Sequence, residues 1–161
     1  MKNYFVASLA YERKYKAYGA FDPASNILVV SKLEQIDHNG LFNREKLIKE
    51  LRLVRESGFQ TLVETRDKSF IKHTPIITLS DRNDESRLYQ DVFFEHLESM
   101  LQSRLLDVGE ERKESFKAFQ NRVKKSVDPR SGRIVYEFKD LERNELRPVM
   151  LLVALHVDPP R

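Results

Sequence analysis

The chain has 161 residues, of which 40% are hydrophobic and 33% are charged, and its formal net charge is +3. A chain of this length buries roughly 70% of the surface that it exposes when extended, which is enough for a core without covalent cross-links. It contains no cysteine, which excludes disulfide scaffolds, thiolate nucleophiles, iron–sulfur clusters and cysteine-bound zinc. We therefore expect residues 1–161 to form a single globular domain of an intracellular, cytoplasmic protein.

The N-terminal part of the chain alternates between apolar stretches and turn residues, which indicates strands. Three strands are predicted, over residues 3–10, 14–21 and 27–36. The segment 22–26, Asp-Pro-Ala-Ser-Asn, favours a tight turn between the last two, because proline presets φ and the polar side chains cap the turn. This part of the sequence predicts a β-meander.

A helix and two short strands are predicted next. Apolar residues recur at helical spacing over residues 44–57, with Asn43 before them as an N-cap and Gly58 after them as a stop signal. Strands are predicted over residues 59–65 and 75–79. Because a strand, a helix and a strand follow one another, we expect at least one parallel strand pair.

The C-terminal half is predicted to contain two helices and two closing strands. The helices cover residues 84–106 and 110–125, and the strands cover residues 134–138 and 149–157. The last strand lies in the longest apolar run of the chain, which is shorter than the ~20 residues that a membrane-spanning helix needs. No membrane partner is expected.

These elements together define the expected fold class. We predict a single α+β or α/β domain with a mixed β-sheet and three principal helices. Its parts, in chain order, are an N-terminal β-meander, a βαβ unit, a helical hairpin and the closing strands.

Charge is distributed unevenly along the predicted helical hairpin. Residues 81–111 contain nine acidic and three basic residues, whereas residues 112–133 contain eight basic and two acidic residues. Clustered lysine and arginine side chains bind polyanions by releasing condensed counterions. An acidic and a basic helix can equally pair with each other, which would neutralise much of the basic charge inside the protein. The sequence leaves both interpretations open.

A second basic cluster, residues 11–18, interleaves lysines with tyrosines. Tyrosine rings can stack on unpaired bases while lysines follow the phosphate backbone. The same alternation is typical of an amphipathic or edge strand. We predict a nucleic-acid-binding protein that uses this strand and the basic helix and turn. The predicted contact residues are Arg13, Lys14, Tyr15, Lys16, Tyr18, Lys113, Lys117, Arg122, Lys124, Lys125, Arg130 and Arg133.

An enzymatic alternative is a metal-dependent nuclease. Two-metal hydrolysis of phosphodiesters needs carboxylates that converge from separate elements, and Asp22, Glu64 and Asp67 lie near predicted strand ends. The predicted element order is compatible with a ribonuclease H-like topology. In that family the first strand contributes a metal-binding aspartate, whereas residues 4–9 here contain no acid. Under this alternative the cofactor would be Mg²⁺ or Mn²⁺.

A third hypothesis is a protein-interaction or regulatory module. Phe93, Phe94, Phe116 and Phe119 could present an aromatic surface on the two helices to a protein partner or to a second copy of the chain. The four histidines lack metal-ligand spacing, and the few glycines form no phosphate-binding loop. No cofactor is therefore expected outside the nuclease alternative, and DNA cannot be distinguished from RNA as the partner.

Overall fold

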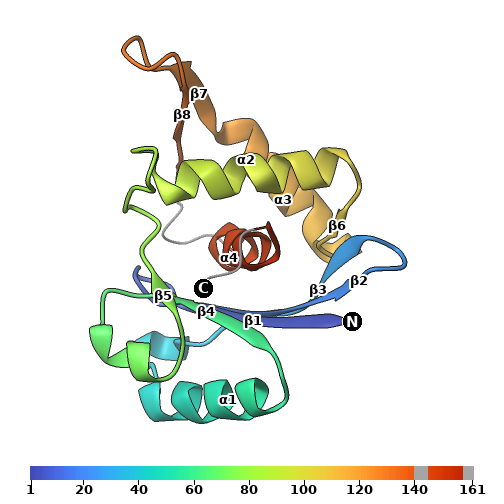
Figure 1. The fold of residues 1–161 in the computed structure, drawn as a ribbon, viewed down its shortest axis with the longest axis vertical. Coiled ribbons are helices and arrows are strands. Elements are labelled where there is room, and N and C mark those ends of the chain that lie inside the picture. The colour runs from blue at the N-terminus through green and yellow to red at the C-terminus, as the bar shows by residue number, and fades with distance from the viewer. Residues whose placement is uncertain (140–144, 158–161) are drawn as a thin grey trace.

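A computed structural model describes residues 1–139 and 145–157 of the chain, which form a six-stranded mixed sheet with helices on both of its faces (Figure 1). The strand order in the sheet is β5-β4-β1-β2-β3-β6. The strands are β1 (Lys2–Ser8), β2 (Tyr15–Asp22), β3 (Ile27–Gln35), β4 (Gln60–Glu64), β5 (Ile76–Ile77) and β6 (Leu106–Asp107). The helices are α1 (Arg44–Glu56), α2 (Tyr89–Gln102), α3 (Glu110–Arg122) and α4 (Leu146–Val157), with short 3-10 helices η1 (His38–Gly40) and η2 (Lys68–Lys72). The predicted mixed α+β fold class is confirmed.

The N-terminal meander and the parallel pair form as predicted. Strands β1, β2 and β3 pair antiparallel in sequence order, and the turn after Asp22 closes with the Asp22 carboxylate accepting from the Ala24 N–H at 2.9 Å. Strand β4 is parallel to β1, and β5 is parallel to β4. The chain reaches β4 through α1, whose N-terminus is capped by the Asn43 side chain. This order brings the carboxyl ends of β1 and β4 together at one edge of the sheet.

Helix α4 replaces the strand predicted over residues 149–157. All of its residues from Leu146 to Leu155 are buried, because the helix lies between the sheet on one side and α2 and α3 on the other (Figure 1). A helix that is buried all round has no polar face, so its apolar run cannot be distinguished from that of a buried strand by spacing. Pro148 lies in the first turn of α4, where a missing N–H breaks no helical hydrogen bond.

Gly19 in β2 allows α4 to pack closely on the sheet. A Cβ atom at this position would lie 3.1 Å from Cδ2 of Leu152, which is tighter than ordinary van der Waals contact. Leu152 is fully buried, and its side chain fills the space that a larger residue in β2 would occupy.

The two helices predicted over residues 84–106 and 110–125 are both shorter in the structure. Helix α3 ends at Arg122, and the following residues form β7 (Lys124–Val127), which pairs antiparallel with β8 (Ile134–Glu137). We call these two strands and their connecting turn the ribbon; it projects beyond the ends of α2 and α3 (Figure 1). Helix α2 begins only at Tyr89, because residues 81–88 form a turn in which the Asn83 side chain accepts from the N–H groups of Glu85 and Arg87.

The four phenylalanines of α2 and α3 lie in the core between α4 and the two helices. Phe93, Phe94, Phe116 and Phe119 are each at most 8% exposed. The predicted aromatic surface for a protein partner or a second copy is therefore wrong for these residues. In the part of the chain that the structure describes, no helix is both long and apolar enough to cross a membrane.

The position of α4 predicts a large cost for truncating its sheet-facing side chains. Leu152→Ala is expected to lower the free energy of unfolding by about 3 kcal/mol, because it removes buried methyl groups and leaves a cavity against Gly19. Val157→Ala, at the exposed end of the same helix, is expected to change it by less than about 0.5 kcal/mol. Urea unfolding monitored by circular dichroism measures both, and equal effects would contradict the placement of α4.

Candidate functional site

Ser8 and Glu64 meet at the carboxyl ends of the two central parallel strands. The two residues are register partners in the β1–β4 pair, and neither side chain is exposed. The Ser8 hydroxyl donates a hydrogen bond to Oε1 of Glu64. The carboxyl ends of parallel strands are a common position for active sites, so we call Ser8, Glu64 and the residue above them, Arg147, the strand-end cluster.

Arg147 reaches the strand-end cluster from the first turn of α4. It is the largest fully buried side chain described, and its Nη2 donates to the backbone carbonyl of Arg13. Its guanidinium carbon lies 4.7 Å from the ring centre of Tyr11 and 5.6 Å from that of Tyr15. These contacts hold a positive charge inside the protein, next to the end of the sheet.

The environment of Glu64 opposes its ionisation. Burial raises the pKa of this carboxyl above its usual value of 4.5, while the hydrogen bond from Ser8 and the positive charge of Arg147 act in the opposite direction. Oε2 of Glu64 has no hydrogen-bond partner among the described residues. The cluster therefore contains one buried carboxyl, partly compensated by a serine and an arginine.

The strand-end cluster does not fit a two-metal centre. Such a centre needs several carboxylates that hold two cations about 3.5–4 Å apart, whereas this cluster supplies one carboxylate and a guanidinium that repels a cation. Within residues 1–139 and 145–157, no group of three or more His, Asp or Glu residues could hold a metal ion. Strand β1, from which the nuclease alternative expects a metal-binding aspartate, contains no acidic residue.

The other two predicted nuclease residues lie away from Glu64. Asp22 ends β2 beside the start of β1, so the length of β1, roughly 20 Å, separates it from Glu64. Asp67 is exposed and caps η2, where its carboxylate accepts from the N–H and hydroxyl of Ser69. Asp22, Glu64 and Asp67 therefore do not form one site, because the structure assigns turn and cap roles to the two aspartates.

The predicted Tyr/Lys strand is largely engaged inside the protein. Tyr15 and Lys16 are buried, and Nζ of Lys16 lies 3.0 Å from Glu34 and 2.9 Å from Glu50. Tyr18 donates to Glu50 and packs edge-on against Phe5. Of the two remaining residues, Arg13 is exposed, and half-buried Lys14 donates from Nζ to the Tyr11 carbonyl. These tyrosines do not offer open faces for stacking on bases.

The basic segment 112–133 is divided between paired and exposed cations. Lys113 pairs with Glu110 at 2.7 Å, Lys125 with Glu98 at 2.9 Å and Arg133 with Glu85 at 3.8 Å. We call the remaining exposed cations of the prediction the free basic set, since none of them has an ion pair with a described residue. They are Lys117, Arg122, Lys124 and Arg130. Ion pairs with acidic residues, which the sequence left open, therefore neutralise only part of the basic segment 112–133.

Comparison with known proteins relates the chain to nuclease domains by fold. No protein-family model and no curated protein matches the sequence. The nuclease domain of the large terminase g2p from bacteriophage SPP1, solved with bound Mn, matches with a TM-score of 0.52 at 10% identity, over 98% of this chain and 87% of that domain. The fold is thus a mixed α+β fold similar to that of this nuclease domain.

Two further solved structures are similar at lower scores. The nuclease domain of the P22 large terminase has a TM-score of 0.49 at 8% identity, over 92% of this chain and 78% of that domain. The fowlpox virus Holliday junction resolvase has a TM-score of 0.38 at 17% identity, over 72% of this chain and 83% of the resolvase.

The raised pKa of Glu64 predicts a specific pH dependence of stability. Between pH 4.5 and the higher pKa in the folded state, the folded protein binds more protons than the unfolded one, so this contribution to stability falls as pH rises. The free energy of unfolding of the wild type is expected to increase relative to that of Glu64→Gln as pH is lowered from 8 to about 5. Glu56→Gln, on the exposed side of α1, is the control; a difference that grows with rising pH would contradict this assignment.

Proposed function

We propose that the chain is a nucleic-acid-binding protein that uses a ribonuclease H-like nuclease fold without two-metal cleavage. It acts as one domain over residues 1–161. The observation that carries this proposal is the strand-end cluster, in which Ser8 and Arg147 accompany a single buried carboxylate, Glu64.

The environment of the cluster disfavours a metal ion. Burial raises the pKa of Glu64, and the positive charge of Arg147, on α4, opposes that shift only in part. A divalent ion would have to displace or approach a fully buried guanidinium that already contacts Tyr11, Tyr15 and the Arg13 carbonyl. The cost of separating those contacts disfavours metal entry at this position.

The free basic set supplies the contacts to phosphates. Lys117 and Arg122 lie on α3, Lys124 begins the ribbon and Arg130 lies at its turn, so the four cations follow one another along α3 and the ribbon (Figure 1). Exposed cations on a projecting element can reach the backbone of a nucleic acid without desolvating a salt bridge.

A second candidate function is the metal-dependent nuclease. It is favoured by one observation, the unsatisfied Oε2 of Glu64 at the end of a central strand in a nuclease-type fold. If this function holds, Glu64 would be the carboxylate from β4, and Mg²⁺ or Mn²⁺ would supply Lewis-acid activation of a phosphodiester when bound.

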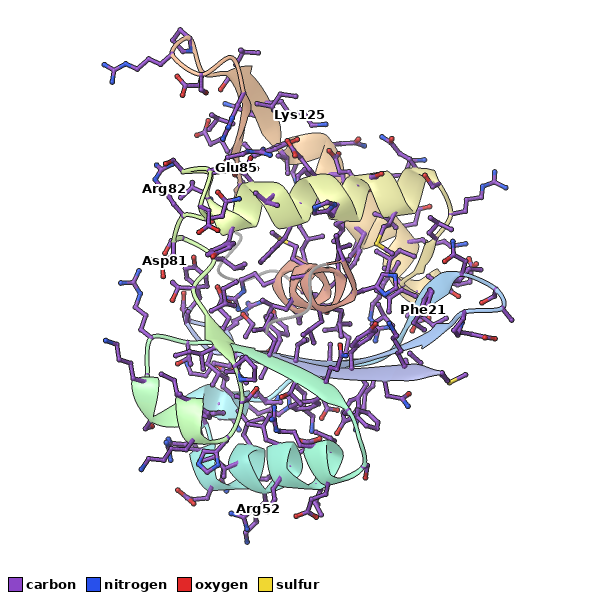
Figure 2. All side chains as sticks on the ribbon, viewed as in Figure 1. Phe21, Arg52, Asp81, Arg82, Glu85 and Lys125 are labelled. Atoms are coloured by element: carbon purple, nitrogen blue, oxygen red, sulfur yellow. The ribbon has the colours of Figure 1, made fainter. Side chains whose placement is uncertain are left out.

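The binding proposal predicts a steep salt dependence that requires the free basic set. About four phosphate contacts give a slope of roughly −3 for log affinity against log salt on single-stranded nucleic acid. Lys124→Glu combined with Arg130→Glu is expected to reduce the slope by about 1.5 and weaken binding at least tenfold. The matched control reverses the same two charges on α1, at Lys49 and Arg52, of which Arg52 points away from the sheet (Figure 2).

Fluorescence anisotropy with labelled single-stranded DNA and RNA, measured over a range of salt concentrations, tests this prediction. Equal losses in the two double variants would contradict an interface on α3 and the ribbon, and absence of binding to any nucleic acid would contradict the proposed function.

The absence of two-metal cleavage is tested separately with varied DNA and RNA substrates in Mg²⁺ and in Mn²⁺. The proposal predicts that all substrates stay intact. Cleavage that depends on the metal and is abolished in Glu64→Gln would instead establish the nuclease function. Arg147→Lys, which keeps the positive charge of the cluster, serves as a variant that tests whether the guanidinium itself is required for folding.

A further inference from the structure

The ribbon carries exposed aliphatic side chains at its outer end. Val127 and Ile134 are register partners in the β7–β8 pair, so their side chains lie next to each other on one face of the ribbon. Val127 is 64% exposed and Ile134 is 42% exposed, and Pro129 in the connecting turn is exposed as well. The base of the ribbon belongs to the core, since Tyr136 packs edge-on against Phe94. The ribbon is thus anchored at its base and apolar at its outer end.

The turn at the end of the ribbon is closed by its own hydrogen bonds. The Asp128 N–H donates to the Arg133 carbonyl, and the Gly132 N–H donates to the Asp128 carbonyl, both at 2.8 Å. The Asp128 carboxylate accepts from the Arg130 N–H and from the Ser131 hydroxyl, both at 3.0 Å. The one carboxylate of the turn is therefore bonded within the turn. Because the turn is already formed, a partner does not have to order it on binding.

Charge is distributed unevenly around the ribbon. Residues 124–137 contain four basic and two acidic residues, and Lys124 and Arg130 among them belong to the free basic set. The turn 81–88, with three acidic and two basic residues, lies beside β8 (Figure 2), where Nη1 of Arg133 donates to the Glu85 carbonyl at 2.6 Å. Strand β7 instead follows α3, which carries the rest of the free basic set. A polyanion is therefore attracted to the α3 side of the ribbon.

The shape of the ribbon matches the major groove of B-form DNA. Neighbouring strands of a sheet are about 4.8 Å apart, and the major groove, about 12 Å wide, admits a two-stranded ribbon with its side chains. The minor groove is about 6 Å wide, and the major groove of an RNA duplex is deep and narrow. Because the ribbon projects beyond the ends of α2 and α3, its outer end can enter a groove while the cations of α3 stay near the phosphates (Figure 1).

We propose that the outer end of the ribbon inserts into the major groove of duplex DNA. Val127 and Ile134 contact thymine C5 methyl groups, which are the apolar groups on the floor of this groove. Lys124 and Arg130 contact phosphates at its margins. The cations beside the apolar end favour this partner over an apolar protein surface, which would desolvate them without compensation. This inference rests on the proposed nucleic-acid binding and specifies its partner as B-form DNA that contains thymine.

Two comparisons of duplexes with the wild-type protein test the insertion by fluorescence anisotropy at one salt concentration. A DNA duplex is expected to bind about tenfold more tightly than an RNA duplex of equal length and corresponding sequence, because only the DNA groove admits contacts to the bases. An alternating adenine–thymine DNA duplex is compared with an alternating adenine–uracil DNA duplex, which lacks only the C5 methyl groups. We expect about fourfold tighter binding of the thymine duplex, the factor for burying one methyl group.

A conservative variant assigns the methyl contact to the ribbon. Val127→Thr keeps the shape of the side chain but replaces one methyl group by a hydroxyl, so the thymine-to-uracil ratio is expected to fall from about four toward one. The salt dependence is expected to stay unchanged, since no charge is altered. The matched control is Val29→Thr in β3, which is 38% exposed and lies in the six-stranded sheet; this variant is expected to keep the wild-type ratio.

The possible outcomes separate the insertion from nucleic-acid binding itself. Equal binding of the thymine and uracil duplexes by the wild type, or equal binding of the DNA and RNA duplexes, overturns the insertion and leaves nucleic-acid binding standing. A ratio that is unchanged in Val127→Thr, or lost equally in both variants, overturns it as well. If no nucleic acid binds, the proposed function fails too. Circular dichroism checks that both variants fold, and the wild-type comparisons decide without them.

Discussion

The arrangement at the strand ends depends on two buried ionisable side chains, Arg147 of α4 and Glu64 of β4, since burial raises the pKa of Glu64 and the positive charge of Arg147 opposes that shift. Buried charges are costly unless they are paired, and the two groups come from segments that are otherwise apolar. Arg147 lies in the first turn of α4, and its contacts with the Arg13 carbonyl, Tyr11 and Tyr15 connect that end of the helix to the segment that follows β1. Among the described residues, the strand-end cluster holds one carboxylate, whereas two-metal catalysis needs several.

Fold and function are therefore separable in this chain. The strand order and the helices on both faces give a mixed α+β fold similar to that of the SPP1 terminase nuclease domain, while the described strand-end cluster consists of a serine, a glutamate and an arginine. A fold of this kind hosts chemistry only where its site residues permit it. Helix α3 packs on this scaffold and the ribbon projects from it, and both carry exposed cations (Figure 1).

The sequence predicted the elements whose signals are local. The turn after Asp22 and the cap at Asn43 act through neighbouring residues, so the meander and α1 form where expected. Helix α4 was not predicted, because burial on all sides removes the periodicity on which such a prediction depends. The strand-end cluster was missed except for Glu64, since Ser8 and Arg147 acquire their roles only through long-range contacts. A charged residue directly before the apolar run, at Arg147, was the one available signal.

The most direct test is whether a divalent ion enters the strand-end cluster. Titration of the full chain with Mn²⁺, followed by paramagnetic broadening of backbone amide signals, reports ion proximity residue by residue. We predict that the amide signals of Ser8, Glu64 and Thr65 broaden no more than that of Gly19, which lies opposite Tyr4 in the β1–β2 pair. Selective broadening at the strand ends, at ion concentrations that leave Gly19 unaffected, would contradict it.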